Sequence, residues 1–197
     1  MTAHRCLFAE GPIAGQTVLV TGGAGAVGNA AIQLAKWGGA NVITTVSSPT
    51  KGEHARQAGA DQVINYRKED VVQVIRDLTD DVGVDRIVEV DFGGNLAVTQ
   101  EIIKNNGTVA VYASAGDREP VLPIYTFLYK NINLRSVLVY NMPRQAKESA
   151  CADINRALQE GALNLKIAEL FPLDQLAAAH ELVESGAYIG TVIVEID

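Results

Sequence analysis

Short apolar runs alternate with segments of helical periodicity along most of the chain. Runs rich in β-branched residues lie at positions 17–20, 41–46, 62–65, 86–90, 107–112 and 133–139. Segments with apolar residues at helical spacing lie between them, near 26–37, 50–58, 69–78, 94–104 and 144–160. Buried strands that alternate with helices are typical of a parallel sheet joined by crossover helices. The pattern therefore predicts a doubly wound α/β fold, for which right-handed crossovers favour the strand order 3-2-1-4-5-6.

The chain departs from this alternation in two places. Pro120 and Pro123 predict a loop or a short helix between the fifth and sixth strands, at the edge of the sheet where such folds usually receive ligands. After residue 161, the pattern predicts a helix near 173–185 and a closing strand at 190–196. We therefore expect one main domain followed by a small helix-strand appendage.

The composition limits the classes of partner. The chain has 197 residues, of which 48% are hydrophobic, and this is enough to bury one sizeable core. Its net charge of -7 gives no attraction for a nucleic acid or an anionic membrane. Cys6 and Cys151 form no Cys-x-x-Cys pair and suggest neither a disulfide framework nor a cysteine-rich zinc site. We expect a cytoplasmic protein with no nucleic-acid or membrane partner.

The clearest chemical signal lies between the first predicted strand and the first predicted helix. The segment contains the motif Gly23-x-Gly25-x-x-Gly28. The early glycines permit a tight turn and a close backbone approach to a pyrophosphate, and the last lets the helix pack on the strand. The amides of Ala26 and Val27, at the positive end of the helix dipole, would hold the anion. A glycine turn that only saves space is the alternative, but the order of strand, motif and helix favours a dinucleotide site.

The segment at 44–51 bears on the choice of cofactor. An acidic residue about 20 positions after the motif would bind an unphosphorylated ribose, and this segment has none. A 2′-phosphate would instead find hydroxyl donors in Ser47 and Ser48 and a cation in Lys51. The alternative is that this segment binds no phosphate: Thr50 or Ser48 would then only cap the following helix, and Lys51 would be a solvated helix residue. The missing acid together with the lysine favours NADPH.

Three segments of the chain, 17–36, 58–67 and 171–181, match one family. They resemble the nucleotide-binding domain of the medium-chain dehydrogenase/reductases, in particular the zinc-independent NADPH:quinone oxidoreductase and zeta-crystallin branch. The resemblance extends from about residue 3 to residue 196. It implies a Rossmann fold that binds NADPH.

The resemblance also implies roles for individual residues. It places Lys51 and Tyr66 against the adenosine 2′-phosphate, beside Ser47 or Ser48. By composition alone, Tyr66 would be an ordinary half-buried aromatic at a strand end. The ends of the fourth, fifth and sixth strands resemble the walls of the family's ribose and nicotinamide pocket, which is where strand ends at the switch point are expected to bind a ligand. These wall candidates are Phe92, Ala113, Ser114, Val139 and Asn141.

The resemblance further implies a division of the chain. Residues 1–8 resemble the helix that connects to a GroES-like catalytic domain in the family. We therefore expect a Rossmann NADP-binding domain with this connecting helix over 1–162, and an appendage over 163–197 that packs on such a catalytic domain. Relatives often carry a basic residue that reaches the cofactor phosphate from the final loop, and the loop at 185–191 contains none.

The expected activity is hydride transfer from NADPH to a small quinone or another conjugated carbonyl. Such a reaction needs two carbons held close and correctly faced, so no catalytic side chain is assigned in this domain. The three histidines, His4, His54 and His180, show no metal-ligand spacing, and no metal is expected. A non-catalytic NADPH-binding module and a domain of an enoyl-thioester reductase are the alternatives. The family further suggests a homodimer that pairs through the sixth strand, since an exposed strand would otherwise invite aggregation.

Overall fold

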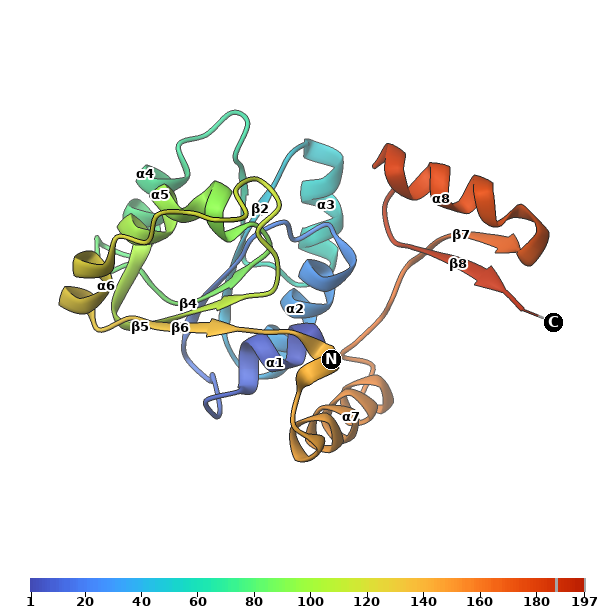
Figure 1. Ribbon diagram of the computed structural model, residues 1–197, viewed down its shortest axis with the longest axis horizontal. Coiled ribbons are helices and arrows are strands. Elements are labelled where there is room, and N and C mark those ends of the chain that lie inside the picture. Colours follow the sequence, from blue (N-terminus) through green and yellow to red (C-terminus); the bar gives the residue numbers. More distant parts are fainter. Residues whose placement is uncertain (187, 197) are drawn as a thin grey trace.

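A six-stranded parallel sheet forms the centre of the computed structural model, which describes residues 1–186 and 188–196 (Figure 1). The strands are β1 (Thr17–Val20), β2 (Asn41–Val46), β3 (Gln62–Asn65), β4 (Val84–Glu89), β5 (Ile103–Val111) and β6 (Asn133–Ser136). Their order across the sheet is β3-β2-β1-β4-β5-β6. The predicted doubly wound fold and strand order are therefore confirmed.

Helices cover both faces of the sheet. They are α1 (Thr2–Phe8), α2 (Ala26–Trp37), α3 (Pro49–Gln57), α4 (Val71–Leu78), α5 (Phe92–Ile102), α6 (Ile124–Lys130) and α7 (Arg144–Gln159). Side chains of α1, α2, α3 and α7 join one apolar cluster, and those of α4, α5 and α6 join the other. Within β1, Val18 and Val20 belong to the first cluster and Leu19 to the second, because successive strand residues point to opposite faces.

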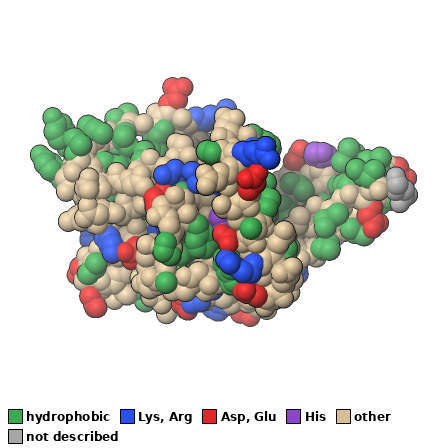
Figure 2. All heavy atoms as spheres, turned by 90° about the horizontal axis from the view of Figure 1, so that it is seen from below, with side chains coloured by type: hydrophobic (Ala, Val, Ile, Leu, Met, Phe, Trp, Pro, Cys, Tyr) green, Lys and Arg blue, Asp and Glu red, His purple; other side chains and the backbone are tan. Residues whose placement is uncertain are grey.

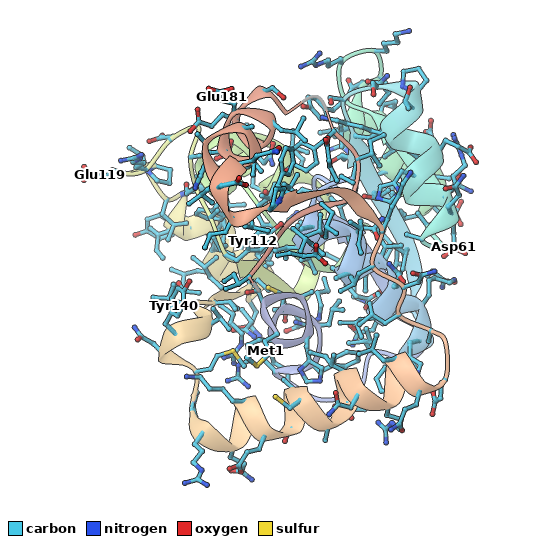
Figure 3. The ribbon with its side chains drawn as sticks, turned by 90° about the vertical axis from the view of Figure 1, so that its right-hand side faces the viewer. Met1, Asp61, Tyr112, Glu119, Tyr140 and Glu181 are labelled. Atoms are coloured by element: carbon cyan, nitrogen blue, oxygen red, sulfur yellow. The ribbon has the colours of Figure 1, made fainter. Side chains whose placement is uncertain are left out.

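Helix α7 lies across α1, near the N-terminus of the chain (Figure 3). A hydrogen bond of 2.9 Å between His4 Nε2 and Asp153 Oδ2 connects the two helices, and the His4 side chain is buried. A helix is therefore present over Thr2–Phe8, and it packs on the main domain; its role as a connection to a second domain stays a prediction.

The largest differences from the predicted strand boundaries are at the start of β5 and the end of β6. Residues 103–106 belong to β5, although the helical pattern was expected to extend to 104, because Ile103 already pairs with Val84. The sixth strand ends at Ser136 rather than 139. The Val137 amide still donates to the Val111 carbonyl at 2.8 Å, but the chain then turns into a 3-10 turn, Val139–Asn141. As an edge strand, β6 has a neighbour on one side only, so little holds it extended.

The C-terminal segment forms a separate lobe beside the sheet (Figure 1). It contains β7 (Ile167–Pro172), a 3-10 turn (Leu173–Gln175), α8 (Leu176–Ser185) and β8 (Thr191–Glu195), and the two strands pair in parallel. The predicted helix and closing strand are present, but β7 was not predicted. Most of its side chains are exposed. A strand of this kind does not need the continuous apolar run by which core strands are recognised in a sequence. Within the described ranges, no helix is long and apolar enough to cross a bilayer.

Candidate cofactor site

The glycine-rich turn lies where β1 ends and α2 begins. Gly22 has a φ of +67°, a conformation that favours glycine, and its amide donates to Thr45 Oγ1 at 3.2 Å. The Gly23 amide donates to the Thr45 carbonyl at 3.1 Å, and the Gly25 amide donates to the Gly22 carbonyl at 3.0 Å. The tight turn therefore depends on Gly22, which precedes the three motif glycines and was not among the predicted site residues.

The three motif glycines have different surroundings. A Cβ on Gly23 would lie 2.0 Å from Thr44 Oγ1, and one on Gly28 would lie 2.4 Å from the Gly22 carbonyl oxygen. A Cβ on Gly25 would meet only that same oxygen, at 3.4 Å. Gly23 and Gly28 therefore permit the close packing of turn, strand and helix, whereas Gly25 faces open space.

The N-terminus of α2 presents unpaired backbone amides. Its first hydrogen bond runs from the Asn29 amide to the Gly25 carbonyl at 2.8 Å, so the amides of Ala26, Val27 and Gly28 precede the helical ladder. The N-cap is Gly25, and the first turn of the helix carries no acidic residue. This end of α2 therefore has the geometry and the dipole that favour a bound phosphate.

A cavity of about 230 Å³ opens beside this turn, and we call it the turn cavity. Its lining residues are Gly22, Ala24, Gly25, Ala26, Val46, Ser47, Lys51, Tyr66, Val183, Gly186, Tyr188 and Gly190. Residues from α8 and the segment that follows it close one side. Five predicted site residues thus share one cavity, and its described lining contains no carboxylate.

Ser48 and Lys51 differ in what they can offer a ligand. Ser48 is the N-cap of α3, and its Oγ accepts a hydrogen bond from the Lys51 amide at 3.3 Å. The alternative capping role is therefore observed for Ser48, which does not line the turn cavity. Across the described residues, no carboxylate pairs with the Lys51 ammonium group, and Ser47 lines the cavity with it.

Tyr66 lies between the turn cavity and a larger one of about 460 Å³, which we call the inner cavity. The inner cavity is lined by Leu19, Thr21, Gly22, Thr45, Tyr66, Val71, Glu89, Val90, Asp91, Asn95, Val98, Thr99 and Ile102. Gly22 and Tyr66 belong to both linings, and the Tyr66 side chain is half exposed. The cavities therefore adjoin at the carboxyl ends of β1 and β2, and the inner cavity combines an apolar wall with polar groups.

Glu89 is a polar residue of the inner cavity that the sequence analysis missed. It is fully buried at the end of β4, and one oxygen, Oε1, accepts three hydrogen bonds. The donors are Thr21 Oγ1 at 2.9 Å, the Asp91 amide at 2.7 Å and Asn95 Nδ2 at 2.8 Å. Burial raises the pKa of the Glu89 carboxyl above its usual value, against these hydrogen bonds. A carboxylate inside an apolar strand, Ile87-Val88-Glu89-Val90, was the available signal.

Three of the predicted pocket walls meet at the N-terminus of α5. The Phe92 amide donates to the Ala113 carbonyl at 3.1 Å, and the Phe92 ring is buried in the apolar core. Ser114 Oγ accepts from the Gly93 amide at 2.9 Å and donates to the Asp117 carbonyl. The Phe92 ring and the Ser114 hydroxyl thus already have partners within the protein.

Val139 and Asn141 lie in the 3-10 turn that follows β6, rather than at the end of the strand. Neither of them lines the turn cavity or the inner cavity, and the same holds for Phe92, Ala113 and Ser114. The ribose and nicotinamide wall remains a prediction for these five residues.

Comparison with known proteins places this site in a family context. The profile of the zinc-binding dehydrogenase family matches residues 26–156. The chain is 28% identical over 189 residues to a 2-haloacrylate reductase from Burkholderia sp, covering 91% of this chain and 55% of that protein. It is 29% identical over 187 residues to a quinone oxidoreductase from Pongo abelii, covering 94% of this chain and 56% of that protein. The chain therefore spans about half the length of these curated relatives.

Solved structures share the whole fold. An NAD-dependent alcohol dehydrogenase superposes with a TM-score of 0.89 at 28% identity, covering 100% of this chain and 56% of that one. A mycobacterial protein in complex with NADPH superposes with a TM-score of 0.88 at 26% identity, covering 99% and 62% of the two chains. Proteins that use either nicotinamide cofactor thus share this arrangement.

Proposed function

The chain belongs to the zinc-binding dehydrogenase family of the medium-chain dehydrogenase/reductases, and from this membership we propose that it is the NADPH-binding domain of a zinc-independent oxidoreductase. The bound cofactor would supply the hydride. A small quinone or another conjugated carbonyl would receive it, in a cleft completed by a second domain. A quinone oxidoreductase and a 2-haloacrylate reductase among the relatives support a conjugated acceptor.

The single observation that carries the cofactor proposal is the composition of the turn cavity. The free amides at the start of α2 suit the pyrophosphate, and Lys51 with Ser47 offers a cation and a hydroxyl to a 2′-phosphate. A carboxylate at this position would repel that phosphate, and the described lining holds none. The adjoining inner cavity, with its apolar wall, suits the adenine ring.

Replacing Lys51 with methionine tests the 2′-phosphate assignment. We expect Lys51→Met to weaken NADPH binding about tenfold or more, because a charge-assisted contact to the phosphate is lost. NADH lacks this phosphate, so its affinity should be nearly unchanged. Fluorescence titration of the purified variants with both cofactors measures the difference.

Lys68→Met is the matched control for this experiment. Lys68 is an exposed lysine just after Tyr66, and it lines neither cavity. It should leave the affinity for both cofactors unchanged. Equal losses of NADPH and NADH affinity in Lys51→Met, or tighter binding of NADH than NADPH to the unmodified chain, would reject the proposed preference.

We also propose that two copies of the chain pair through the edge of the sheet. β6 is an edge strand, and Leu138 and Tyr140 beyond it are exposed. Hydrophobic side chains also gather at the end of the molecule that carries α6 (Figure 2). An uncovered strand edge with exposed apolar side chains beside it favours association.

Light scattering after size-exclusion chromatography tests the dimer. The unmodified chain should elute as a dimer, and Leu138→Lys should shift it to a monomer because it places a charge in the apolar patch. Leu170→Lys is the control, since Leu170 is also an exposed leucine but lies on β7 in the C-terminal lobe. A monomer at high concentration of the unmodified chain would exclude this interface.

A further inference from the structure

A second pocket, of polar character, lies outside the proposed cofactor site. It has a volume of about 340 Å³, between α2, α3 and the segment that leads to β7, and we call it the linker pocket. Its lining residues are Asn29, Gln33, His54, Gln57, Ala58, Asn164 and Lys166. A smaller hollow, which shares Asn29, His54 and Lys166 with it, extends towards Gly25 and Ala26. The described lining of both contains amides, an imidazole and an ammonium group but no carboxylate.

The linker pocket is held in shape by Gln33. Its Nε2 donates to the Asn164 carbonyl at 2.9 Å, and its Oε1 accepts from the Asn164 amide at 2.6 Å. The same Nε2 also donates to Asn29 Oδ1 at 2.7 Å. The Gln33 amide group thus ties the backbone of the linker to α2, and its hydrogen bond to Asn29 Oδ1 leaves the Asn29 amide nitrogen as the unpaired end of that side chain.

The free end of Asn29 is its amide nitrogen. The residue is 7% exposed, and Nδ2 has no hydrogen-bond partner within the described structure. Leaving a buried N–H group without a partner is unfavourable, and the partial positive charge of this group favours an anion in the space beside it. Asn29 lines both the linker pocket and the hollow beside it.

His54 and Lys166 add to the donors around Asn29. His54 is 9% exposed, and both burial and the nearby Lys166 charge lower the pKa of its imidazole, so the neutral ring with one N–H donor is favoured. Lys166 carries the only cationic side chain of the described lining. Gln57 already has a hydrogen-bond partner, because its Nε2 donates to Glu53 Oε1 at 3.3 Å. Glu53 itself does not line the pocket.

We propose that the linker pocket is a binding site for a phosphate group, separate from the cofactor site. The His54 side chain, from α3, and the Lys166 ammonium group, from the segment before β7, offer donors to an oxyanion from two different segments, and Asn29 Nδ2 is buried without a partner in the adjoining wall. The start of α2, through Gly25 and Ala26 at the edge of the adjoining hollow, adds a favourable dipole. The phosphate is either inorganic phosphate or the end of a phosphate monoester. This site does not depend on the proposed NADPH function.

Proton NMR of His54 tests the proposal locally. The chain has three histidines, so His54→Gln identifies the His54 signal by its disappearance. Titration with inorganic phosphate should shift that signal in a saturable way, both without NADPH and at saturating NADPH. Glycerol 3-phosphate in parallel distinguishes the two sources, because a monoester site binds it more tightly than inorganic phosphate. Acetate at the same ionic strength should cause little shift.

Asn29→Asp is the sharpest variant. The aspartate keeps an acceptor for Gln33 Nε2 but replaces the free N–H group with a negative oxygen. We expect this variant to lower the phosphate affinity, measured at the His54 signal, at least about tenfold. Lys166→Met should cause a similar loss, and because Lys166 is exposed, this change should leave the fold intact. Lys147→Met, on α7 and away from the lining, should have no effect.

Three results would overturn this site. The first is no phosphate-dependent shift of the His54 signal at tens of millimolar phosphate. The second is a shift that Lys166→Met and a folded Asn29→Asp both leave unchanged. The third is a shift that NADPH abolishes, which would assign the phosphate to the cofactor turn. Failure of NADPH to bind would leave the phosphate titration interpretable, so the two proposals can fail separately.

Discussion

Gly28→Ala should destabilise the chain by about 3 kcal/mol and abolish measurable cofactor binding. The new Cβ would lie 2.4 Å from the Gly22 carbonyl oxygen and 3.0 Å from Gly23 Cα. Both contacts are with backbone atoms, so no side-chain rotation relieves them, and either the turn opens or α2 moves away from β1. Each movement displaces the amides that would hold the pyrophosphate. Urea denaturation, followed by circular dichroism, measures the loss of stability.

Gly25→Ala is the control for this prediction. Gly25 has a φ of -75°, which any residue adopts, and its added Cβ would lie 3.4 Å from the Gly22 carbonyl oxygen. The free energy of unfolding should therefore change by less than about 1 kcal/mol. If Gly28→Ala and Gly25→Ala have equal stability, the close approach of α2 to the turn does not constrain position 28.

Glu89→Ala should destabilise the chain by about 3 kcal/mol or more, because it leaves the three donors around Oε1 without their acceptor. Those donors belong to the end of β1, the start of α5 and its first turn. Without the Glu89 carboxylate, the hydrogen bonds that connect these parts of the inner cavity lining are lost. Glu89→Gln keeps a carbonyl acceptor of nearly the same shape. The glutamine variant should therefore be at least as stable as the unmodified chain near neutral pH.

The pH dependence of stability separates the charge of Glu89 from its hydrogen bonds. Burial raises the pKa of this carboxyl in the folded chain above the value of 4.5 expected when it is exposed. The folded state then holds the proton more tightly than the unfolded state, so this contribution to stability is complete below pH 4.5 and is lost as the pH rises through the folded pKa. Glu89→Gln cannot ionise, and its stability should not show this fall.

Denaturant unfolding at a series of pH values measures that difference. The stability of Glu89→Gln relative to the unmodified chain should increase as the pH rises above 4.5 and then level off. A constant difference across this range would mean that Glu89 has an ordinary pKa in the folded chain. A glutamine variant as unstable as Glu89→Ala would mean that the negative charge itself is required.

The candidate site was predictable where the information is local in the sequence. The motif glycines lie where a strand ends and a helix begins, and Ser47 and Lys51 lie soon after the next strand, so motif and spacing sufficed to predict that Gly25, Ser47 and Lys51 share one cavity. The capping role of Ser48 was also visible as an alternative. The strand-end candidates were harder to predict, because the conformations of the loop after β5 and the turn after β6 depend on contacts with α5 and on the lack of a neighbour beyond the edge strand.

By itself, the sequence determined the order of the strands, the dinucleotide turn and the family. Hydrophobic periodicity, glycine spacing and crossover handedness are properties of short segments, so they can be recognised without knowledge of the tertiary packing. Only the tertiary structure decided that Gly22 adopts the left-handed conformation of the turn, that Glu89 is buried at the end of β4, and that Asn29, His54 and Lys166 share a pocket. These features depend on contacts between residues far apart in the chain, where burial and missing hydrogen-bond partners are set by what packs alongside.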